Sequence, residues 1–523
     1  MRQIPVAMAT QHPDSAVKYV PVQEEPEEAR ECFTDYGFDE YMVDYEGKLT
    51  PYHQTAQVVG EVINAGLEPG KDVFITPRMP SASMENVFRQ LMALMSIMEA
   101  QYKGSESYDH LSVVEVIHPM SSEADELVGA RNRMLDVAGL AERELGIEIP
   151  PEEFELIPLI EEIPELLTVG NLLKDYSEKV KEIVPLPEVF RLLIGRSDPA
   201  LSYGHVAASL ACKVAISEAY RAGEDIGFEI SPILGAGTLP FRGHASPENL
   251  DNLIKEYSGI RTLTVQSALR YDHGREATKG VIKKLKTSLP KAKPLSYSEE
   301  DRKEITYIIA TFVREYLLSF YYIDYSGLLR VSDLMPDRRD RLARKGALGY
   351  AREVPMPSKI ASLIEDRELA LELQRLQIDK FPELPRAIKF TGALYTIGLP
   401  PEFIGTGRGL KALDRKGKLD IFFDFYPSIK EDMEFAAGFL NLGVVESFLP
   451  EYAMKLVRRD VEYVYEYLDI EPRQKDKEAL GMMVRLKPYL KYMLLDTEKL
   501  LDVEKELAHE MIMKIAKARK ALG

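Results

Sequence analysis

The chain has 523 residues, enough for two to four ordinary domains or for one large α/β barrel with additions. Its 84 acidic side chains outnumber the 66 basic ones, and the formal net charge of −18 argues against generic binding to nucleic acid or anionic membranes. The two cysteines, Cys32 and Cys212, lie far apart, which excludes a disulfide scaffold and a cysteine-rich zinc site.

No stretch of the sequence predicts a signal sequence or a membrane-spanning helix. The apolar run near the N-terminus, "IPVAMAT", is too short for a signal sequence. The most apolar later stretch, "ITYIIATFVREYLLSFYYI", is interrupted by Arg314 and Glu315, as expected of a buried helix. The charge run at 336–346 indicates a solvated helix or a subunit contact. We therefore expect a cytoplasmic protein with neither a membrane nor a nucleic acid among its partners.

The first half of the chain repeats one unit: a short run rich in Val, Ile and Leu, a polar residue, and a stretch with helical spacing. Such runs are typical of parallel strands that are covered on both faces. The eight candidate strands are residues 4–10, 41–45, 72–77, 111–119, 154–160, 189–195, 227–234 and 261–267. Eight such units predict an α/β protein with a (β/α)₈, TIM-like barrel, in which the residues just after each strand share one rim.

The character of the chain changes near "LPKAKPLSYSEED", where Ser298 and Asp301 have capping-box spacing before a long helix. From there the pattern is mostly helical, so we expect many additional α-helices. The predicted organisation is a barrel over 1–295, bearing most catalytic residues, and a mainly helical region over 296–523 packed on it. Within that region, 385–413 is predicted to return to the site as a loop. We expect the two regions to form one cooperative unit.

The strand ends place polar and charged residues on the predicted rim. They are His12, Asp44, Arg78, His118, Glu161, Arg196, Asp198, Ser231 and Gln266. Catalytic groups in such barrels come from the carboxyl ends of several strands. Carboxylates among Arg and His residues indicate a hard divalent cation beside an anionic substrate. A single carboxylate after an apolar run is more often a helix cap or a loop residue, so the prediction rests on the recurrence of such residues in successive units.

His12 illustrates the two interpretations. It stands in "MATQHPDSA" directly before Pro13, which can end a strand and leave His12 as an ordinary loop residue. On the barrel hypothesis it lies at the mouth, where a side chain with a pKa of about 6.5 can take or give a proton. This stretch alone leaves both interpretations open.

Four motifs resemble a known family, and they occur in the same order along the chain. "TQHPDS" resembles the "T-A-H-P-T-E" motif of phosphoenolpyruvate carboxylases, and "IPLIEE" resembles their "V-P-L-F-E-T". "RSDPALSYG" resembles "Y-S-D-S-x-K-D-x-G", and "RTLTVQSALRYDHG" resembles "R-V-T-E-Q-G-E-M-I-R-F-K-Y-G". The length and the segments "MATQHPDS" and "LPFRGH" are similar to the compact, archaeal-type members over essentially the whole chain.

This resemblance implies a carboxy-lyase that converts phosphoenolpyruvate and bicarbonate into oxaloacetate and phosphate, an anaplerotic reaction. In the family's mechanism bicarbonate attacks phosphorus and gives carboxyphosphate and the enolate of pyruvate, which then attacks CO₂. The resemblance assigns Glu161 and Asp198 as ligands of Mg²⁺ or Mn²⁺. It assigns His12 as a catalytic residue that assists the breakdown of carboxyphosphate, and it implies a homotetramer.

Arginines are expected to clamp the anions, because a planar guanidinium binds phosphate or carboxylate through two bonds. By resemblance, Arg242 in "LPFRGH" and Arg408 in "GTGRG" are catalytic, and Arg78 in "ITPRMP" is the first choice for phosphate. The backbone of Gly407 would approach an anion closely. Two further arginines could bind substrate or could form structural ion pairs: Arg196 and Arg270.

The chain departs from the large members of the family in two places. Leu201 stands where their motif has Lys, and "LPFRGH" replaces a longer loop, which puts the effector control of the large enzymes in doubt. One alternative is a barrel lyase or mutase of the isocitrate lyase and phosphoenolpyruvate mutase type, whose Cys or Asp motif we do not find. The other is a non-catalytic helical scaffold, against which the retained site residues argue.

Overall fold

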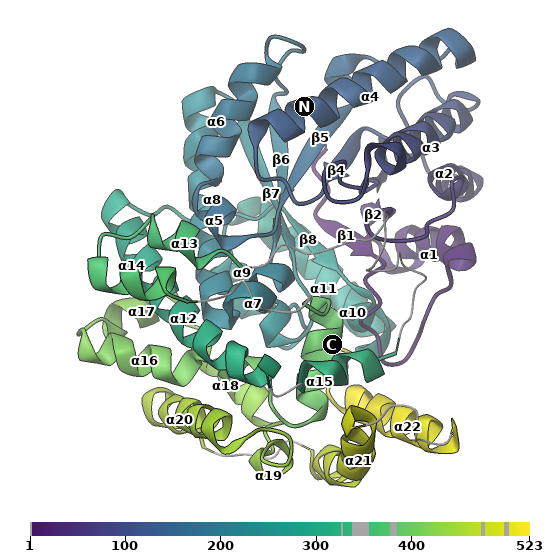
Figure 1. Ribbon diagram of the computed structural model, residues 1–523. Coiled ribbons are helices and arrows are strands. Elements are labelled where there is room, and N and C mark those ends of the chain that lie inside the picture. The colour runs from purple at the N-terminus through teal and green to yellow at the C-terminus, as the bar shows by residue number, and fades with distance from the viewer. Residues whose placement is uncertain (1–2, 326–327, 337–354, 377–383, 472–475, 496–501) are drawn as a thin grey trace.

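The computed structural model describes residues 3–325, 328–336, 355–376, 384–471, 476–495 and 502–523 (Figure 1). At its centre are eight parallel strands, each of which overlaps one of the eight predicted segments. They are β1 (Ala7–Thr10), β2 (Glu40–Met42), β3 (Phe74–Ile75), β4 (Glu115–His118), β5 (Glu155–Ile160), β6 (Val189–Gly195), β7 (Glu229–Gly235) and β8 (Thr262–Val265).

The sheet closes into a barrel. Its hydrogen-bonded order is β3-β2-β1-β8-β7-β6-β5-β4, and the residues just after β3 pair in parallel with β4. Ile117 N donates to Pro77 O at 2.8 Å, and Met79 N donates to Ile117 O at 3.0 Å. The predicted (β/α)₈ barrel is therefore confirmed, and its carboxyl ends form one rim.

Side chains fill the interior of the barrel. A cluster of buried apolar side chains comes from six strands: Met8, Met42, Ile117, Ile157, Leu159, Leu193 and Ile233. Toward the amino ends of the strands, Arg191 is buried between Glu40 and Glu115, with N–O distances of 2.7 Å to each carboxylate. A buried guanidinium needs partners that compensate for its lost hydration, and here two carboxylates supply them, so this ion cluster fills the amino end of the barrel.

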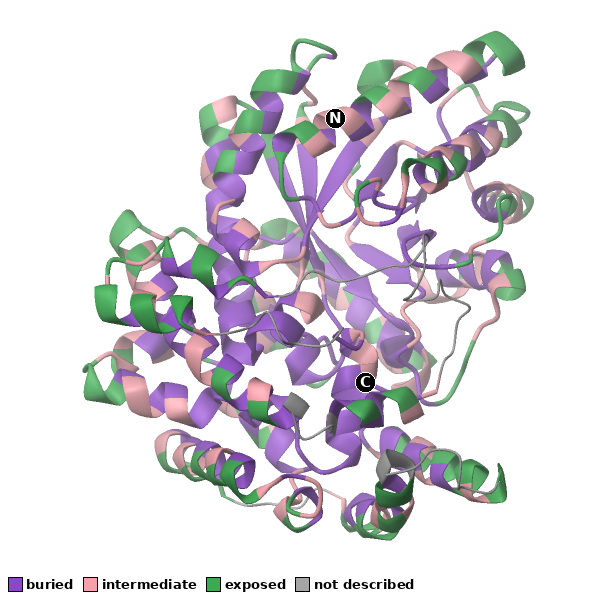
Figure 2. Ribbon diagram, in the orientation of Figure 1, coloured by how far each residue is buried: buried purple, intermediate pink, exposed green. Residues whose placement is uncertain are grey.

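Helices follow the strands and cover the outside of the barrel (Figure 1). They are α1 (Glu25–Glu31), α2 (Gln54–Asn64), α3 (Val87–Ser105), α4 (Ala124–Leu145), α5 (Ile163–Leu167), α6 (Val169–Val180), α7 (Ser197–Tyr203), α8 (His205–Ile226), α9 (Leu250–Glu256), α10 (Ser267–Asp272) and α11 (Arg275–Ser288). Most residues of α8 are buried, because this helix packs against α5, α6 and α7 and also against a long helix of the second half, α12 (Glu299–Tyr325) (Figure 2).

Every regular element among the described residues after 295 is a helix, as predicted. Besides α12 they include α13 (Pro357–Ala361), α14 (Arg367–Gln374), α15 (Ala387–Thr396), α16 (Thr406–Arg415), α17 (Leu419–Phe425), α18 (Ile429–Ala437), α19 (Leu442–Val445), α20 (Glu451–Leu468), α21 (Lys477–Leu495) and α22 (Asp502–Ala518). Short 3₁₀ turns occur at η4 (Pro240–Arg242), η6 (Leu328–Leu334) and η7 (Pro401–Phe403). One hydrophobic core spans both halves; the rings of Phe241 and Phe390, for example, lie 5.6 Å apart.

The structure corrects one expectation about the helical half. Segment 385–413 is not a loop but forms α15, η7 and α16; the Gly398–Pro401 stretch that suggested a loop only separates the helices. The charge run at 336–346 lies, apart from Pro336, outside the described residues. In the part of the chain that the structure describes, we find no helix that combines the length and apolarity needed to cross a membrane.

Candidate active site

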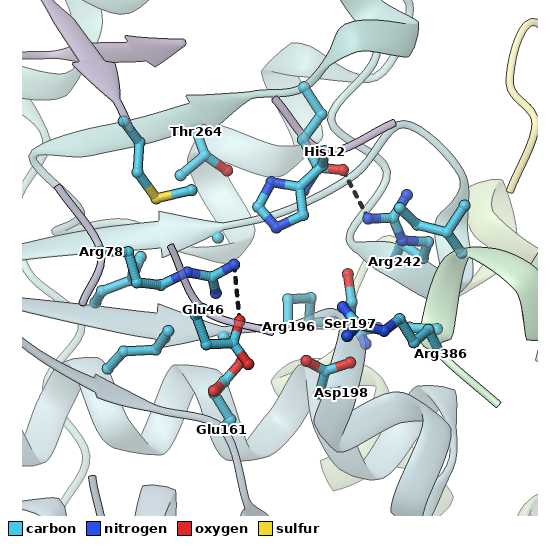
Figure 3. Close-up of a pocket in the computed structure, with 18 of the residues that line it drawn as sticks. His12, Glu46, Arg78, Glu161, Arg196, Ser197, Asp198, Arg242, Thr264 and Arg386 are labelled. Atoms are coloured by element: carbon cyan, nitrogen blue, oxygen red, sulfur yellow. Dashed lines mark hydrogen bonds and ion pairs between the residues drawn. The ribbon is translucent and has the colours of Figure 1, made fainter. Parts of the chain in front are cut away.

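A pocket opens at the carboxyl ends of the barrel strands (Figure 3). Its polar lining residues are His12, Glu46, Lys48, Arg78, Glu161, Arg196, Ser197, Asp198, Arg242, Thr264, Gln266 and Arg386. Nine residues were assigned as catalytic, substrate-binding or metal-binding from the sequence. Six of them meet here, namely His12, Arg78, Glu161, Arg196, Asp198 and Arg242. The strand-end rule explains this convergence, because parallel strands bring their last residues to one rim.

His12 follows β1, and its loop is fixed to the end of the barrel. Its Nδ1 lies 2.9 Å from the hydroxyl of Thr10, and Asp14 accepts a hydrogen bond of 2.7 Å from Ala268 N at the start of α10. In Figure 3 the imidazole ring points into the pocket from above. Burial, together with the positive charges of Arg78 and Lys48, holds the pKa of His12 well below its usual value. His12 is thus a neutral imidazole at neutral pH.

Arg78 enters the pocket already paired with carboxylates. Its Nε and Nη2 donate to Asp44 at 2.9 and 2.7 Å, and Nη2 also lies 2.9 Å from Glu46. Lys48 pairs with the same Asp44 carboxylate. Burial alone would raise the pKa of Asp44, but the two cations hold it well below its usual range. The network fixes the direction of the Arg78 guanidinium before any ligand binds.

Arg242 reaches the pocket on the loop after β7, which we call the Arg242 loop (residues 236–246). Its Nη1 donates to Asp14 at 3.1 Å, and its Nη2 donates to Gln266 at 2.6 Å. Two glycines are required here: a Cβ on Gly237 would lie 2.8 Å from the Arg242 guanidinium carbon, and Gly243 has φ of +117°. The guanidinium is almost fully buried, so its direction is set by these contacts.

Two carboxylates share the lower part of the pocket. Glu161 follows β5 and accepts from Met120 N at 3.3 Å, and Asp198 lies in the first turn of α7. Figure 3 shows both side chains pointing into the same space, and both also line a neighbouring hollow at Ser121 and Glu126. In the described residues no group of three or more His, Cys, Asp or Glu side chains could hold a metal ion. Two carboxylates nevertheless fit Mg²⁺, which commonly takes its other ligands from water and substrate.

The other predicted arginines are held in structural contacts. Arg196 lines the pocket, but its guanidinium donates to Tyr257, to Ser209 and to the carbonyl of Phe241. Arg270 lies in α10. It pairs with Glu28 at 2.8 Å and donates to the carbonyl of Thr10, the last residue of β1, at 2.8 Å. Neither guanidinium is directed at the pocket, so the structure favours a structural role for both, through an ion pair with Glu28 for Arg270 and through hydrogen bonds to uncharged groups for Arg196.

The structure does not bring Arg408 or Gly407 to the pocket. Arg408 pairs with Asp460 at 3.0 Å and with Glu315 at 2.9 Å, at the junction of α12, α16 and α20. Gly407 packs against the same junction, where an added Cβ would lie 2.0 Å from the carbonyl oxygen of Asp460. The glycines of "GTGRG" therefore permit close packing of helices instead of the expected approach to an anion.

Sequence reasoning missed three charged residues of the pocket. Glu46 and Lys48 follow β2 in "DYEGK". Asp44 was placed on the rim because it stands just after a strand, and the same argument applies to these two residues. Arg386 precedes α15 in the helical region, and its guanidinium donates to Gly47 O at 3.3 Å. Segment 385–413 was expected to return to the site, and Arg386 does line the pocket, but no local pattern singled out this residue, whose contact joins residues 339 positions apart.

The barrel and its rim define a class of protein, the (β/α)₈-barrel enzymes whose site joins arginines to a pair of carboxylates for an anionic substrate. Within that class, residues 4–523 match the family model described as phosphoenolpyruvate carboxylase. The chain belongs to the phosphoenolpyruvate carboxylase family, and to its compact, archaeal-type branch.

Curated relatives with this name match nearly end to end. The enzyme of Methanopyrus kandleri is 44% identical over 99% of this chain and 98% of its own length. That of Methanosarcina acetivorans is 42% identical over 99% of both chains, and that of Metallosphaera sedula is 32% identical over 100% of both. A solved HpcH/Hpal aldolase/citrate lyase family protein from Burkholderia cenocepacia covers 54% of this chain and 95% of its own at 14% identity, with a TM-score of 0.34.

Proposed function

We propose that the chain catalyses the conversion of phosphoenolpyruvate and bicarbonate into oxaloacetate and phosphate. One observation carries the proposal: a chain of this family brings His12, Arg78, Arg242 and the Glu161–Asp198 carboxylates into one pocket at the barrel rim. The family match also argues against the lyase or mutase alternative and against a non-catalytic scaffold.

Phosphoenolpyruvate carries a phosphate and a carboxylate, so its site must supply several fixed cations. Arg78, Arg242 and Arg386 reach the pocket from three different parts of the chain, after β3, after β7 and before α15. We assign these guanidiniums to the substrate's anionic groups, for which their planar geometry is suited. Lys48 lines the same pocket, and we propose that it supplies the positive charge absent at the buried Leu201.

Glu161 and Asp198 are the residues that would hold Mg²⁺ or Mn²⁺, in keeping with the fit of two carboxylates described above. When bound, such a cation stabilises the negative charge that develops on the substrate's oxygens as phosphate leaves. Glu161 follows β5 and Asp198 lies in α7 just after β6, so the ends of two adjacent strands bring the carboxylates together. Their own task is to hold that cation in the lower part of the pocket.

His12 is assigned to the proton transfer that follows attack of bicarbonate on phosphorus. Carboxyphosphate retains a carboxyl proton, and a neutral imidazole can remove it as the C–O bond to phosphate breaks and CO₂ is released. The proton then passes from His12 to the departing phosphate, and the enolate attacks CO₂ to form oxaloacetate. With Nδ1 donating its hydrogen to the Thr10 hydroxyl, the ring is oriented and Nε2 is the nitrogen available for this transfer.

Two further properties are inferred by family membership. We propose that the protein works in the cytoplasm and assembles as a homotetramer. Size-exclusion chromatography with light scattering tests the assembly: we expect about four times the chain mass of 59.2 kDa. A monomer at micromolar concentration would overturn the tetramer.

The activity itself is tested by coupling oxaloacetate to NADH oxidation through malate dehydrogenase. We expect NADH to disappear only when phosphoenolpyruvate, bicarbonate and Mg²⁺ are all present. A folded protein that yields no oxaloacetate under these conditions would overturn the proposed function.

A further inference from the structure

A carboxylate of the helical region, that of Asp432, contacts the Arg242 loop from outside the barrel. Asp432 lies in α18 and is almost fully buried. Its Oδ1 lies 2.5 Å from Nδ1 of His244, a residue of the Arg242 loop. Its Oδ2 accepts a hydrogen bond of 2.6 Å from the hydroxyl of Tyr426 and lies 3.4 Å from Nε2 of His205. One side chain of α18 thus joins a barrel loop to a barrel helix.

The backbone conformation of the Arg242 loop explains why this contact matters. His244 has φ of +56°, a left-handed conformation that residues with a Cβ adopt rarely. It follows Gly243, which is also left-handed, and it stands two residues after Arg242. Such a backbone persists only when its surroundings hold it, and the bond from the His244 ring to Asp432 is the charged contact that does so.

The contacts of Asp432 extend through Tyr426 and His205 to Arg196, another residue of the pocket lining. Tyr426 lies 2.9 Å from Nε2 of His205, whose Nδ1 is 3.1 Å from Nη2 of Arg196. Arg196 in turn donates to the carbonyl of Phe241 at 3.2 Å. The chain of contacts from Asp432 therefore returns to the Arg242 loop on its other flank, next to Arg242 itself.

We propose that Asp432 is a positioning residue for Arg242: through His244 it holds the Arg242 loop in the conformation that turns Arg242 into the pocket. The proposal rests on the role that the proposed function gives to Arg242. Asp432 itself lies outside the pocket lining, so its effect on the reaction is indirect. It makes the helical region a working part of the site and not only a cover for the barrel.

The first test replaces Asp432→Asn and measures steady-state kinetics with phosphoenolpyruvate as the varied substrate. We expect kcat/KM to fall on the order of 10²-fold, the effect of a displaced binding group. Glu256→Gln is the matched control, because Glu256 is equally buried and also joins the two halves, through Lys213 and the backbone N of Ser428. Glu256 makes no contact of this kind with the Arg242 loop, so the kcat/KM of the Glu256→Gln variant should stay within about twofold of the parent.

A double-mutant cycle separates positioning from a general loss of structure. If Asp432 acts only through Arg242, the variant with both Asp432→Asn and Arg242→Gln should be no slower than Arg242→Gln alone. Multiplied losses in the double variant would overturn the proposal. His244→Asn supplies a second route if Asp432→Asn folds poorly, because Asn tolerates a left-handed backbone but removes the ring that contacts Asp432. It should reproduce the same kinetic loss.

Hydrogen–deuterium exchange tests the proposal independently of catalysis. Asp432→Asn and His244→Asn should speed exchange in the peptide covering 236–246 at least tenfold, whereas Glu256→Gln should leave that peptide unchanged. Unchanged exchange in the two variants would overturn the positioning role whatever the activity. If the parent protein makes no oxaloacetate, the proposed function fails, and the exchange measurement still decides whether Asp432 holds the loop.

Discussion

At the scale of single residues, the pocket is built from cations that buried carboxylates have already oriented. Arg78 is fixed by Asp44 and Glu46, and Arg242 is fixed by Asp14. Side chains held in this way lose little conformational freedom when a ligand binds, so more of the interaction energy appears as affinity. The neutral His12 completes the arrangement as a group that can accept a proton beside these charges.

Replacing His12→Asn should separate the two halves of the proposed reaction. Asn keeps a polar group at the site but cannot carry the proton, so oxaloacetate formation should fall by about 10²–10⁴-fold, the usual range for a lost general base. Bicarbonate-dependent release of phosphate from phosphoenolpyruvate should persist, measured with a phosphate assay beside the coupled assay. His53→Asn is the control, since His53 is exposed and pairs with Glu99. Carboxylation at the parent rate would contradict the role.

The carboxylate pair should control the metal requirement. Glu161→Gln and Asp198→Asn each remove one charged oxygen ligand, so the Mg²⁺ concentration at half-maximal rate should rise at least tenfold. The measurement is a Mg²⁺ titration of oxaloacetate formation at saturating phosphoenolpyruvate. Glu68→Gln serves as control, because Glu68 pairs with the exposed Lys71 and lines neither the pocket nor the neighbouring hollow. An unchanged titration in Glu161→Gln would refute its assignment as a ligand.

Glu402 should make stability fall with pH. Burial, reinforced by the negative charge of Asp432, raises the pKa of Glu402 from its usual 4.5 to about 7, against hydrogen bonds from Tyr395 and Phe241 N. As pH rises from 4.5 to about 7 the unfolded chain loses this proton first, so the folded state loses about 3 kcal/mol. Glu402→Gln cannot ionise and should remove that loss. Urea unfolding at pH 5 and pH 8 measures it, and an equal pH dependence in both proteins would contradict the prediction.

At the scale of elements, the sequence predicted the barrel better than the site. The strands were recognisable because parallel strands covered on both faces are mostly apolar, as "FELIPLI" and "VFRLLIG" show apart from Glu155 and Arg191. Strand ends then placed His12, Arg78 and Glu161 on the rim by geometry alone. Their roles remain predictions, because position in a pocket does not establish chemistry.

The misplaced Arg408 and Gly407 and the missed Arg386 belong to the helical half, where position depends on packing between distant segments, whereas the missed Glu46 and Lys48 lie after β2 in the barrel. Arg386 reaches the pocket only because α15 packs at the barrel rim. Arg408 has a partner 52 residues further on, Asp460, that holds it elsewhere. A motif such as "GTGRG" cannot distinguish an anion loop from a tight helix junction, since both require glycine.

The α12–α16–α20 junction should therefore depend on Arg408 for stability and not for substrate binding. Arg408→Met leaves the buried Asp460 carboxylate without its cation, which should cost about 3 kcal/mol in free energy of unfolding. Urea denaturation measures this loss, and steady-state kinetics of the folded fraction should show a KM for phosphoenolpyruvate within about twofold of the parent. A KM that rises tenfold while the protein stays folded would restore Arg408 to the site.

At the scale of the whole molecule, the two halves depend on each other for both core and site. Helix α8 is buried because α12 covers the side that the barrel leaves open, and Phe241 of the Arg242 loop packs on Phe390 of α15. Glu402 and Asp432 of the helical half also accept hydrogen bonds from the Arg242 loop. A barrel without the helical half would expose apolar surface on α8 and lose the contacts that shape its own rim.

We therefore expect residues 1–295 expressed alone to lack a cooperative fold. The isolated barrel should aggregate or show a broad thermal transition by circular dichroism, because its exposed apolar face favours association over a unique packed state. Chain 296–523 added in trans should restore solubility and a sharper transition if the shared core is what the barrel lacks. A soluble 1–295 with a single sharp melting transition would show instead that the barrel is an independent domain. In that case the helical half would be needed only to place Arg242 and Arg386, and adding it in trans should restore activity without raising the melting temperature of the barrel.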